Sequence, residues 1–261
     1  MMVLDGRTAL VTGGAGYLGQ AMCLALAESG AHVLVNSRRA ATCEDFVDRL
    51  TARGLSASPA IFDVTDAAAV DGFLADRRPE TPLHILVNNA SSGRGGTVET
   101  ATDSDYANAY DIAVIAAQRL IRGLLPALRE ARRQDGDAAI VNIASMYGVV
   151  SPELRNYDSV QGSNPPFYGA AKAGLIHLTR YAACEFAPEG IRCNAIAPGP
   201  FPNPKTQRDL PDMVARLVAR VPMGRIGDAA EIAGPVTFLA SPAASYVTGA
   251  IIPVDGGWTA W

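Results

Sequence analysis

The chain has 261 residues, a formal net charge of −4 from 22 basic and 26 acidic residues, and 49% hydrophobic residues. These values allow a large buried core, and they exclude a long basic surface of the kind that binds nucleic acid or an anionic membrane. The beginning, MMVLDGRTALVTGG, lacks the features of a signal peptide, and no apolar run reaches about 18 residues. We therefore expect a soluble, cytoplasmic protein.

The four cysteines, at 23, 43, 184 and 193, are scattered and form no CxxC pair. This spacing argues against a disulfide framework or a zinc site, so no metal site is predicted. Cys23 and Cys184 fall on apolar faces of expected helices, which predicts that both side chains are buried.

Short apolar runs alternate with longer helical patterns along the whole chain. The runs are rich in β-branched residues and continuous, as in parallel strands that are buried on both faces. They lie at 7–12, 31–36, 58–62, 84–89, 138–144, 191–197 and 250–255. The helical patterns lie near 17–29, 41–53, 66–77, 103–130, 168–187, 209–220 and 228–240. This alternation predicts an α/β fold, with one doubly wound domain spanning 1–261.

The segment VTGGAGYLG at 11–19 follows the first expected strand and opens a helix. Its glycines at 14, 16 and 19 spell G-x-G-x-x-G, which lets the backbone approach a pyrophosphate at a helix N-terminus. A purely structural turn is the alternative, but the strand-before, helix-after context favours dinucleotide binding.

The second strand ends in VNSRR at 35–39, where an acidic residue usually holds the ribose 2′-hydroxyl of NAD. Ser37 and Arg38 stand there instead, and an arginine suits a 2′-phosphate. The sequence therefore favours NADP(H), with NAD(H) as the alternative if Arg38 and Arg39 are solvated loop charges.

Two further strand ends carry polar residues. In FDVTD, Asp63 can accept from an adenine amino group while Val64 packs on the ring; alternatively Asp63 shapes the turn and Asp66 caps a helix. In VNNAS at 87–91, consecutive asparagines in a buried strand need hydrogen bonds. Their position suits cofactor contact or bracing of the glycine turn.

Tyr168 lies one helical turn before Lys172 in NPPFYGAAKAG. A nearby ammonium is expected to lower the pKa of the phenol, so that Tyr168 can exchange a proton with a substrate alcohol or carbonyl. Ser145, at the end of the fifth strand, is placed to hold the substrate oxygen. Tyr-x-x-x-Lys alone is common on helix surfaces, but its placement together with Ser145 on a dinucleotide-type sheet favours catalysis.

Together these motifs resemble a short-chain dehydrogenase/reductase of the single-domain type, similar to gluconate 5-dehydrogenases and oxoacyl reductases. The resemblance covers the whole chain and includes TGGAGYLG, NNAS, IASMYG, YGAAK, IRCNAIAPGP and YVTGAIIPVDGGW. It implies a Rossmann-type sheet of seven mainly parallel strands, and homodimers or homotetramers that pair through 103–130 and 168–187. It also implies Ser145, Tyr168 and Lys172 as catalytic residues, acting on a ketone or secondary alcohol.

The resemblance and the individual motifs together define the predicted cofactor contacts. These are Gly13, Gly14, Gly16, Tyr17, Leu18, Gly19, Ser37, Arg38, Asp63, Val64, Asn89, Ala90, Ser91, Tyr168, Lys172, Pro198, Gly199 and Phe201.

The chain departs from the family pattern at several places. Tyr17 stands where single-domain members usually have glycine, a spacing closer to that of the larger extended members. Ala113 replaces the asparagine that supports a proton-relay water, and Asn108 lies too far along the helix to substitute for it. Asn203 stands where a threonine often meets the nicotinamide carboxamide.

The segment between Ser145 and Tyr168 is longer than usual, which makes 149–167 an insertion. Its polar residues predict a wall of the substrate pocket and a small polar substrate such as a sugar, sugar acid or polyol; a surface loop or a subunit contact is the alternative. The segment 201–225 is expected to be a mobile lid. The last residues, GGWTAW, are expected either to contact another subunit or to pack locally.

The sequence is also compatible with two other functions. A non-catalytic nucleotide-binding or scaffold protein draws support from Ala113. Epimerase or dehydratase chemistry draws on the glycine spacing, but the short chain lacks the second domain that such enzymes use.

Overall fold

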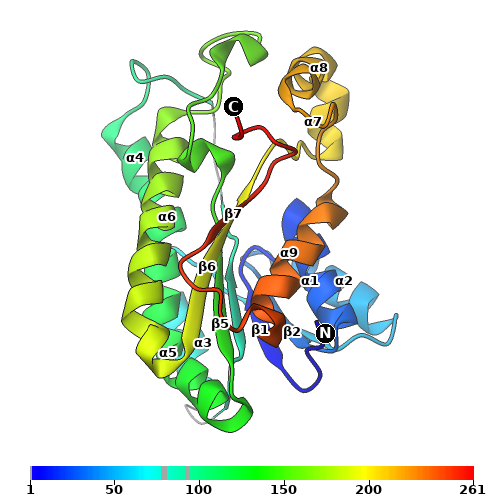
Figure 1. Cartoon of the computed structure of the whole chain (residues 1–261), viewed down its shortest axis with the longest axis vertical. Helices are drawn as coiled ribbons and strands as arrows, with labels where there is room; N and C mark the ends of the chain where they lie inside the picture. The colour runs from blue at the N-terminus through cyan, green and yellow to red at the C-terminus, as the bar shows by residue number, and fades with distance from the viewer. Residues whose placement is uncertain (1, 78–80, 92–94) are drawn as a thin grey trace.

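A computed structural model describes residues 2–77, 81–91 and 95–261. Its centre is one sheet of seven strands, all parallel, in the order β3-β2-β1-β4-β5-β6-β7 (Figure 1). The strands are β1 (Thr8–Val11), β2 (His32–Ser37), β3 (Ala57–Ile61), β4 (Ile85–Asn88), β5 (Ala138–Ile143), β6 (Ile191–Pro198) and β7 (Ile251–Val254). The predicted α/β fold with a seven-stranded parallel sheet is confirmed.

Helices cover both faces of the sheet, as the repeated strand–helix alternation predicted. In Figure 1, α1, α2 and α9 lie on one side, whereas α3, α5 and α6 lie on the other. The helices are α1 (Tyr17–Glu28), α2 (Ala40–Thr51), α3 (Ala67–Ala75), α4 (Asp103–Tyr110), α5 (Ala116–Asp135), α6 (Pro166–Phe186), α7 (Pro204–Asp209), α8 (Pro211–Arg220) and α9 (Ala233–Ala240).

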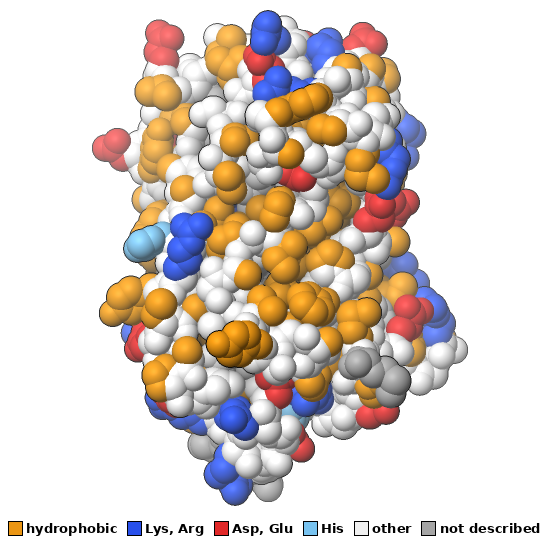
Figure 2. All heavy atoms as spheres, in the orientation of Figure 1, with side chains coloured by type: hydrophobic (Ala, Val, Ile, Leu, Met, Phe, Trp, Pro, Cys, Tyr) orange, Lys and Arg blue, Asp and Glu red, His pale blue; other side chains and the backbone are white. Residues whose placement is uncertain are grey.

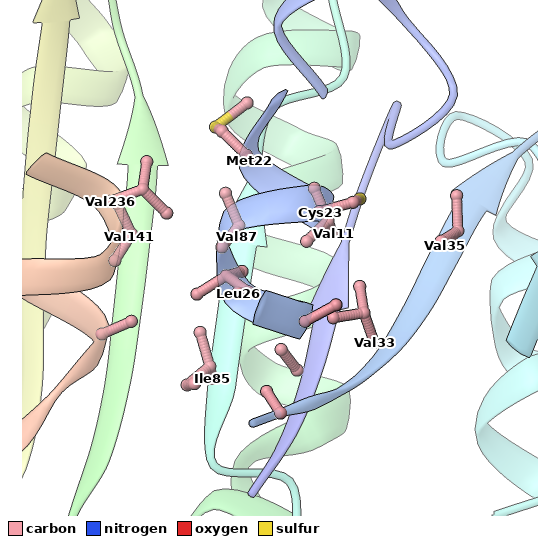
Figure 3. Close-up of a cluster of buried hydrophobic side chains, with 14 of the residues drawn as sticks. Val11, Met22, Cys23, Leu26, Val33, Val35, Ile85, Val87, Val141 and Val236 are labelled. Carbon is pink, nitrogen blue, oxygen red and sulfur yellow. The ribbon is translucent and has the colours of Figure 1, made fainter. Parts of the chain in front are cut away.

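The apolar side chains of each strand divide between two cores because successive residues of a strand point to opposite faces. In β1, Ala9 and Val11 join the core beneath α1 and α9, whereas Leu10 joins the core beneath α5 and α6. Figure 3 shows the first of these cores, in which Met22 and Leu26 of α1 lie near valines of the central strands. All six residues of β5 are buried, which explains its continuous apolar sequence.

The strand order reverses at β1, which pairs with β2 on one side and β4 on the other. The connections leaving β1 and β4 therefore run to opposite faces of the sheet, and a crevice forms between them at the carboxyl ends of the strands. The glycine turn and the motifs VNSRR, FDVTD, VNNAS and IASMYG follow strands at this edge, whereas Tyr168 and Lys172 lie on α6.

The helices differ from the sequence prediction in three regions. Of the helix expected at 228–240, Ala229–Ile232 is 3-10 helical and Ala233–Ala240 forms α9. The single helix expected at 103–130 is α4, a π-helical turn at Asp111–Ile115, and α5, which continues to Asp135. The helix expected at 209–220 is α8, and a further short helix, α7, precedes it in the segment predicted to be a lid. Asn203 caps α7 by accepting from the Thr206 N–H at 2.9 Å.

Two other predictions can be compared with the structure. Cys23 is buried, as expected, but Cys184 is exposed, so the prediction that it packs in the core was wrong. The apolar neighbours of Cys184 in the sequence belong to the buried face of α6, and the cysteine lies on the other face. Among the described residues, no helix combines the length and the apolar character needed to cross a membrane.

Candidate active site

The glycine turn between β1 and α1 is held in a shape that depends on glycine at two positions. Gly13 has a φ of +61°, in the region that other residues rarely adopt. A Cβ on Gly19 would lie 2.2 Å from the Gly13 carbonyl oxygen, because α1 begins directly against the turn. The first N–H groups of α1 have no side-chain cap, since Gly16 occupies the N-cap position. A helix start of this kind suits an anionic ligand.

Hydrogen bonds tie this turn to the end of β4. The Thr12 hydroxyl accepts from the N–H groups of Asn89 and Ala90 at 2.9 and 3.0 Å. The Asn89 side chain donates to the carbonyl oxygens of Thr12 and Gly13 at 2.9 and 3.2 Å. Of the two roles considered for the asparagines of VNNAS, Asn89 therefore performs the bracing of the glycine turn.

Asn36, at the end of β2, supports the turn from the other side. Its side-chain oxygen accepts from the Gly13 N–H at 3.3 Å, and its amide nitrogen donates to the carbonyl oxygens of Ala60 and Phe62, both at 3.0 Å. Asn36 and Thr12 were not predicted from the sequence. Both are polar residues at the end of a buried strand, and this same pattern predicted a role for Asn89.

The switch point opens into a crevice of about 440 Å³. Predicted cofactor contacts make up most of its lining: Gly13, Gly16, Tyr17, Leu18, Gly19, Ser37, Arg38, Asp63, Val64, Asn89, Ala90 and Ser91. The remaining lining residues were not predicted: Ala15, Asn36, Arg39, Phe62 and Ile112.

Arg38 and Asp63 face each other at the rim of this crevice. The Arg38 Nη1 lies 3.7 Å from the Asp63 Oδ2, and the Arg38 side chain is 71% exposed. The backbone and hydroxyl of Thr65 donate to Asp63, which holds the pKa of its carboxyl below the ordinary value, and Arg38 adds to this effect. Asp63 therefore shapes the turn and Asp66 caps α3, which is one of the two alternatives predicted from the sequence.

Ser145 and Tyr168 come together at the carboxyl edge of β5. Ser145 is buried at 6% exposure and caps the following turn by accepting from the Tyr147 N–H at 3.1 Å. The Ser145 hydroxyl lies near enough to the Tyr168 phenol to lower its pKa. The arrangement places two hydroxyls where one substrate oxygen can contact both.

Lys172 lies one turn along α6 from Tyr168. Its Nζ is 5.7 Å from the centroid of the Tyr168 ring and donates to the Ile143 carbonyl oxygen at 2.7 Å. Lys172 is 3% exposed, and this burial lowers the pKa of its ammonium to about 8.

The pKa of Tyr168 differs from the sequence expectation. Burial raises the pKa of its phenol, and the nearby Ser145 hydroxyl offsets only part of that effect. The prediction that Lys172 lowers this pKa was wrong. Both groups are desolvated by burial, and the Lys172 ammonium donates to the Ile143 carbonyl oxygen. Tyr168 is therefore protonated at neutral pH, which suits a proton donor to a ketone.

Ala113 lies within the π-helical turn and is 6% exposed. It packs with Phe167, Ala171 and Leu175 of α6, so apolar contacts fill the place of the family asparagine. A void of about 10 Å³ separates Ala113 from Asn88, whose side-chain oxygen has no hydrogen-bond partner among the described residues. Asn108 is exposed on α4.

Several predicted cofactor contacts do not line the crevice. Gly14 lies behind the turn, where a Cβ would approach the Cys23 sulfur at 2.9 Å. Gly199 packs against Asp255, and Phe201 lines a separate pocket of about 410 Å³. Tyr168, Lys172 and Pro198 are likewise absent from the crevice lining.

The insertion at 149–167 borders a pocket of about 700 Å³, which also includes residues 96–99 and the start of α6. On its other side, Arg216 of α8 donates to the Asn156 carbonyl oxygen at 2.9 Å and pairs with Asp158. The predicted pocket wall and the predicted lid thus contact each other directly. Trp258 is 2% exposed and packs within its own chain, whereas Trp261 is 75% exposed.

Comparison with known proteins places this site in a family. A family model described as enoyl-(acyl carrier protein) reductase matches residues 14–259. The chain belongs to the short-chain dehydrogenase/reductase family. It is 37% identical to galactitol 2-dehydrogenase (L-tagatose-forming) of Cereibacter sphaeroides, over 99% of this chain and 97% of that protein.

Two further relatives have other names. This chain is 36% identical to a rhamnolipid-biosynthesis 3-oxoacyl-[acyl-carrier-protein] reductase of Pseudomonas aeruginosa, over 98% of this chain and 97% of that protein. A protein from Beutenbergia cavernae, assigned as an NAD(P)-dependent gluconate 5-dehydrogenase, was solved with NADP bound at low occupancy. It matches with a TM-score of 0.85 and 33% identity, over 100% of this chain and 99% of that one.

The tight contact at Gly19 predicts a loss of dinucleotide affinity in the Gly19→Ala variant of this dehydrogenase/reductase. The added Cβ must push the Gly13 carbonyl outward, which should weaken NADPH binding about tenfold or more in a fluorescence titration. The control is Gly72→Ala on α3, where a Cβ meets open space and affinity should not change. Equal affinities of the two variants would contradict the assigned role of the turn.

Proposed function

We propose that the protein is an NADP(H)-dependent oxidoreductase that interconverts a ketone and a secondary alcohol on a small, polar substrate. The observation that carries this proposal is the placement of the Ser145 hydroxyl beside the Tyr168 phenol, with Lys172 one turn away, at the same sheet edge as the crevice. A site with two hydroxyls and a buried ammonium can bind a carbonyl oxygen and deliver a proton to it.

The residues of the crevice fit a dinucleotide cofactor. The uncapped start of α1 and the turn at 13–19 would hold the pyrophosphate, while Ser37 and Arg38 would meet the adenosine ribose. The exposed Arg38 guanidinium favours a 2′-phosphate, and the Beutenbergia cavernae relative carries NADP. NAD(H) is the alternative. When bound, the nicotinamide supplies or accepts the hydride.

Tyr168 and Ser145 act on the substrate oxygen in this proposal. Ser145 is fixed by its bond from the Tyr147 N–H, so its hydroxyl can orient the carbonyl toward Tyr168. In reduction, Tyr168 gives its proton to the oxygen as negative charge develops there; in oxidation, it takes the proton back. The raised pKa of Tyr168 favours the protonated form that reduction requires.

Lys172 stabilises the phenolate that forms when Tyr168 gives up its proton. The low-dielectric surroundings that lower the pKa of Lys172 also strengthen its attraction to a new negative charge. Its bond to Ile143 fixes the ammonium beside the ring, and the same group can reach the ribose of a bound nucleotide.

Two features support a polar substrate. The insertion at 149–167 brings the side chains of Ser151, Gln161, Ser163 and Asn164 to the lining of the pocket of about 700 Å³, which also includes Tyr147, two residues after Ser145. The relatives include a galactitol 2-dehydrogenase, although a 3-oxoacyl reductase is almost as similar. We further propose that 1–261 act as one domain, in which 149–167 borders the substrate and 201–225 closes over it.

We also propose that the protein assembles into homotetramers or homodimers. Tyr106 and Tyr110 of α4 are 40% and 48% exposed, and Tyr181 of α6 is 66% exposed, so the predicted pairing helices carry aromatic surface. Figure 2 shows hydrophobic side chains across the middle of another face, which carries β7 and α9 in Figure 1. Two apolar faces suit a tetramer. A cytoplasmic location stays a prediction from the sequence.

Tyr168→Phe tests the proposed proton transfer. We expect kcat/KM for ketone reduction to fall by about 100-fold or more, because the variant lacks the hydroxyl that gives the proton. NADPH affinity in a fluorescence titration should be nearly unchanged. Tyr246→Phe, at a fully exposed position, is the control. Undiminished turnover in Tyr168→Phe would exclude the assigned role.

Arg38→Ala tests the cofactor preference. Removing a charged partner of the 2′-phosphate should weaken NADPH binding roughly 10- to 100-fold and leave NADH binding almost unchanged. The comparison variant is Arg49→Ala on α2, whose side chain lies outside the crevice lining. NADH binding as tight as NADPH binding in the unmodified protein would overturn the choice of NADP(H).

The pH dependence of ketone reduction tests Lys172. We expect kcat/KM to be constant at neutral pH and to fall as the pH rises through about 8, because Lys172 then loses the charge that stabilises the Tyr168 phenolate. Tyr168 itself cannot cause this fall, since its pKa is raised above its ordinary value of 10.0. A flat profile of NADPH consumption from pH 7 to about 10 would contradict this role for Lys172.

A further inference from the structure

Four segments that are distant in sequence meet beside Tyr168. Tyr147 follows Ser145 in the turn after β5, and it packs with Leu217 of α8 and with Trp258 near the carboxyl end of the chain. Tyr168 packs against the same cluster. The insertion contributes Tyr157, whose hydroxyl lies 2.9 Å from the Tyr147 hydroxyl. The surface next to the reacting hydroxyls is therefore formed jointly by the insertion at 149–167, the predicted lid at 201–225 and the last residues of the chain.

The two phenols leave one donor and one acceptor for a ligand. Tyr157 shares a hydrogen bond with Tyr147, and the Asn164 backbone lies near enough to lower the pKa of the Tyr157 phenol. When Tyr147 donates in that bond, the proton of Tyr157 and the lone pairs of Tyr147 stay unused. One donor beside one acceptor matches the hydrogen-bonding needs of an alcohol hydroxyl.

Buried polar atoms in the same walls also lack partners among the described residues. They are the side-chain nitrogen of Asn156, the side-chain oxygen of Asn164 and the Nε of Arg220. Asn156 is 6% exposed and directly precedes Tyr157. Because buried polar groups in folded proteins are almost always hydrogen-bonded, their concentration here indicates a wall that is completed by a polar ligand.

Arg220, the last residue of α8, brings to this wall a positive charge that is only weakly paired with a carboxylate. Its guanidinium carbon lies 5.4 Å from the centroid of the Trp258 ring. The nearest carboxylate is that of Glu153, at 4.0 Å, and Glu153 is already bound by Arg155 at 2.7 and 2.9 Å. Arg220 therefore has donors available for a carboxylate, an anion that its planar fork binds well.

We propose that Tyr147, Tyr157 and Arg220 form a subsite for the far end of the substrate, and that this subsite prefers a polyhydroxylated carboxylic acid over a neutral polyol or a bare alcohol. The proposal rests on the proposed function, because it assumes that the reacting carbon lies at Tyr168. The phenol pair binds a hydroxyl along the substrate chain, and Arg220 binds the terminal carboxylate.

Trp258 provides a readout that does not depend on turnover. The chain has two tryptophans, so a Trp261→Phe background leaves Trp258, beneath Arg220, as the single reporter. This variant also carries Tyr168→Phe, so that the ligands are not oxidised, and it is titrated with gluconate, galactitol and cyclohexanol at saturating NADP⁺. We expect gluconate to bind most tightly and galactitol more weakly, while cyclohexanol leaves the emission unchanged at the same concentrations.

Two variants separate the contributions to this preference. Tyr157→Phe should weaken gluconate and galactitol binding by about fivefold to tenfold each, because both use the phenol pair. Arg220→Gln should weaken gluconate binding roughly 10- to 100-fold and change galactitol little, since it removes the charge and keeps a polar side chain. Tyr246→Phe and Arg208→Gln, at exposed positions, are the matched controls.

The proposal is overturned if cyclohexanol binds as tightly as gluconate, if neither polyhydroxylated probe binds, or if the two variants alter all ligands equally. Oxidation of the same three probes with NADP⁺, in the unmodified protein and in Tyr168→Phe, separates this failure from failure of the proposed function. Arg220-dependent binding of gluconate without any Tyr168-dependent turnover would overturn the proposed function and leave the binding preference standing. Tyr168-dependent turnover without the preference for gluconate would overturn the proposed subsite and leave the proposed function standing.

Discussion

The hydrogen bonds between the ends of β1 and β4 fix the point on which the site depends. Thr12 accepts from two backbone N–H groups of the β4 end, and Asn89 donates back to the turn. Without this connection, the strand ends would still be joined by the backbone bond from the Thr12 N–H to the Val87 carbonyl oxygen at 2.9 Å, but the glycine turn would lose its side-chain bonds to the residues that follow β4. The glycine turn, the start of α1 and the polar residues after β4 take their relative positions from it.

Burial determines the chemistry at the other half of the site. Tyr168 and Lys172 are placed at adjacent turns of α6, and their burial raises the pKa of the phenol and lowers the pKa of the ammonium to about 8. Each pKa is thus shifted in the direction that favours the neutral form of its group. A neutral phenol and a weakly basic amine cost less to bury than two charges. The pair acquires charge separation when a substrate oxygen takes the proton, so the electrostatic benefit appears at the moment of reaction.

Much of the fold could be predicted from the sequence because parallel strands that are buried on both faces leave continuous apolar runs. The site residues could be predicted because the carboxyl ends of such strands meet at one edge, so motifs far apart in the chain converge. The directions of individual side chains could not be predicted in the same way. Phe201 and Gly14 belong to motifs near the crevice, yet packing against Gly227 and Cys23 removes them from its lining. The exposure of Cys184 depends on its position around α6, where each residue turns the side chain by about 100° and Cys184 falls outside the buried face that includes Ala182 and Ala183.

The contact between α8 and the insertion has a consequence for how the site opens. Arg216 joins both the backbone of Asn156 and the carboxylate of Asp158, so the two walls move as one body unless these bonds break. The arginine and aspartate side chains are 36% and 66% exposed, and ion pairs in such surroundings are screened by dissolved salt. Ionic strength therefore sets how firmly the two walls are joined, and the composition of the surrounding solution becomes part of the control of access to Tyr168.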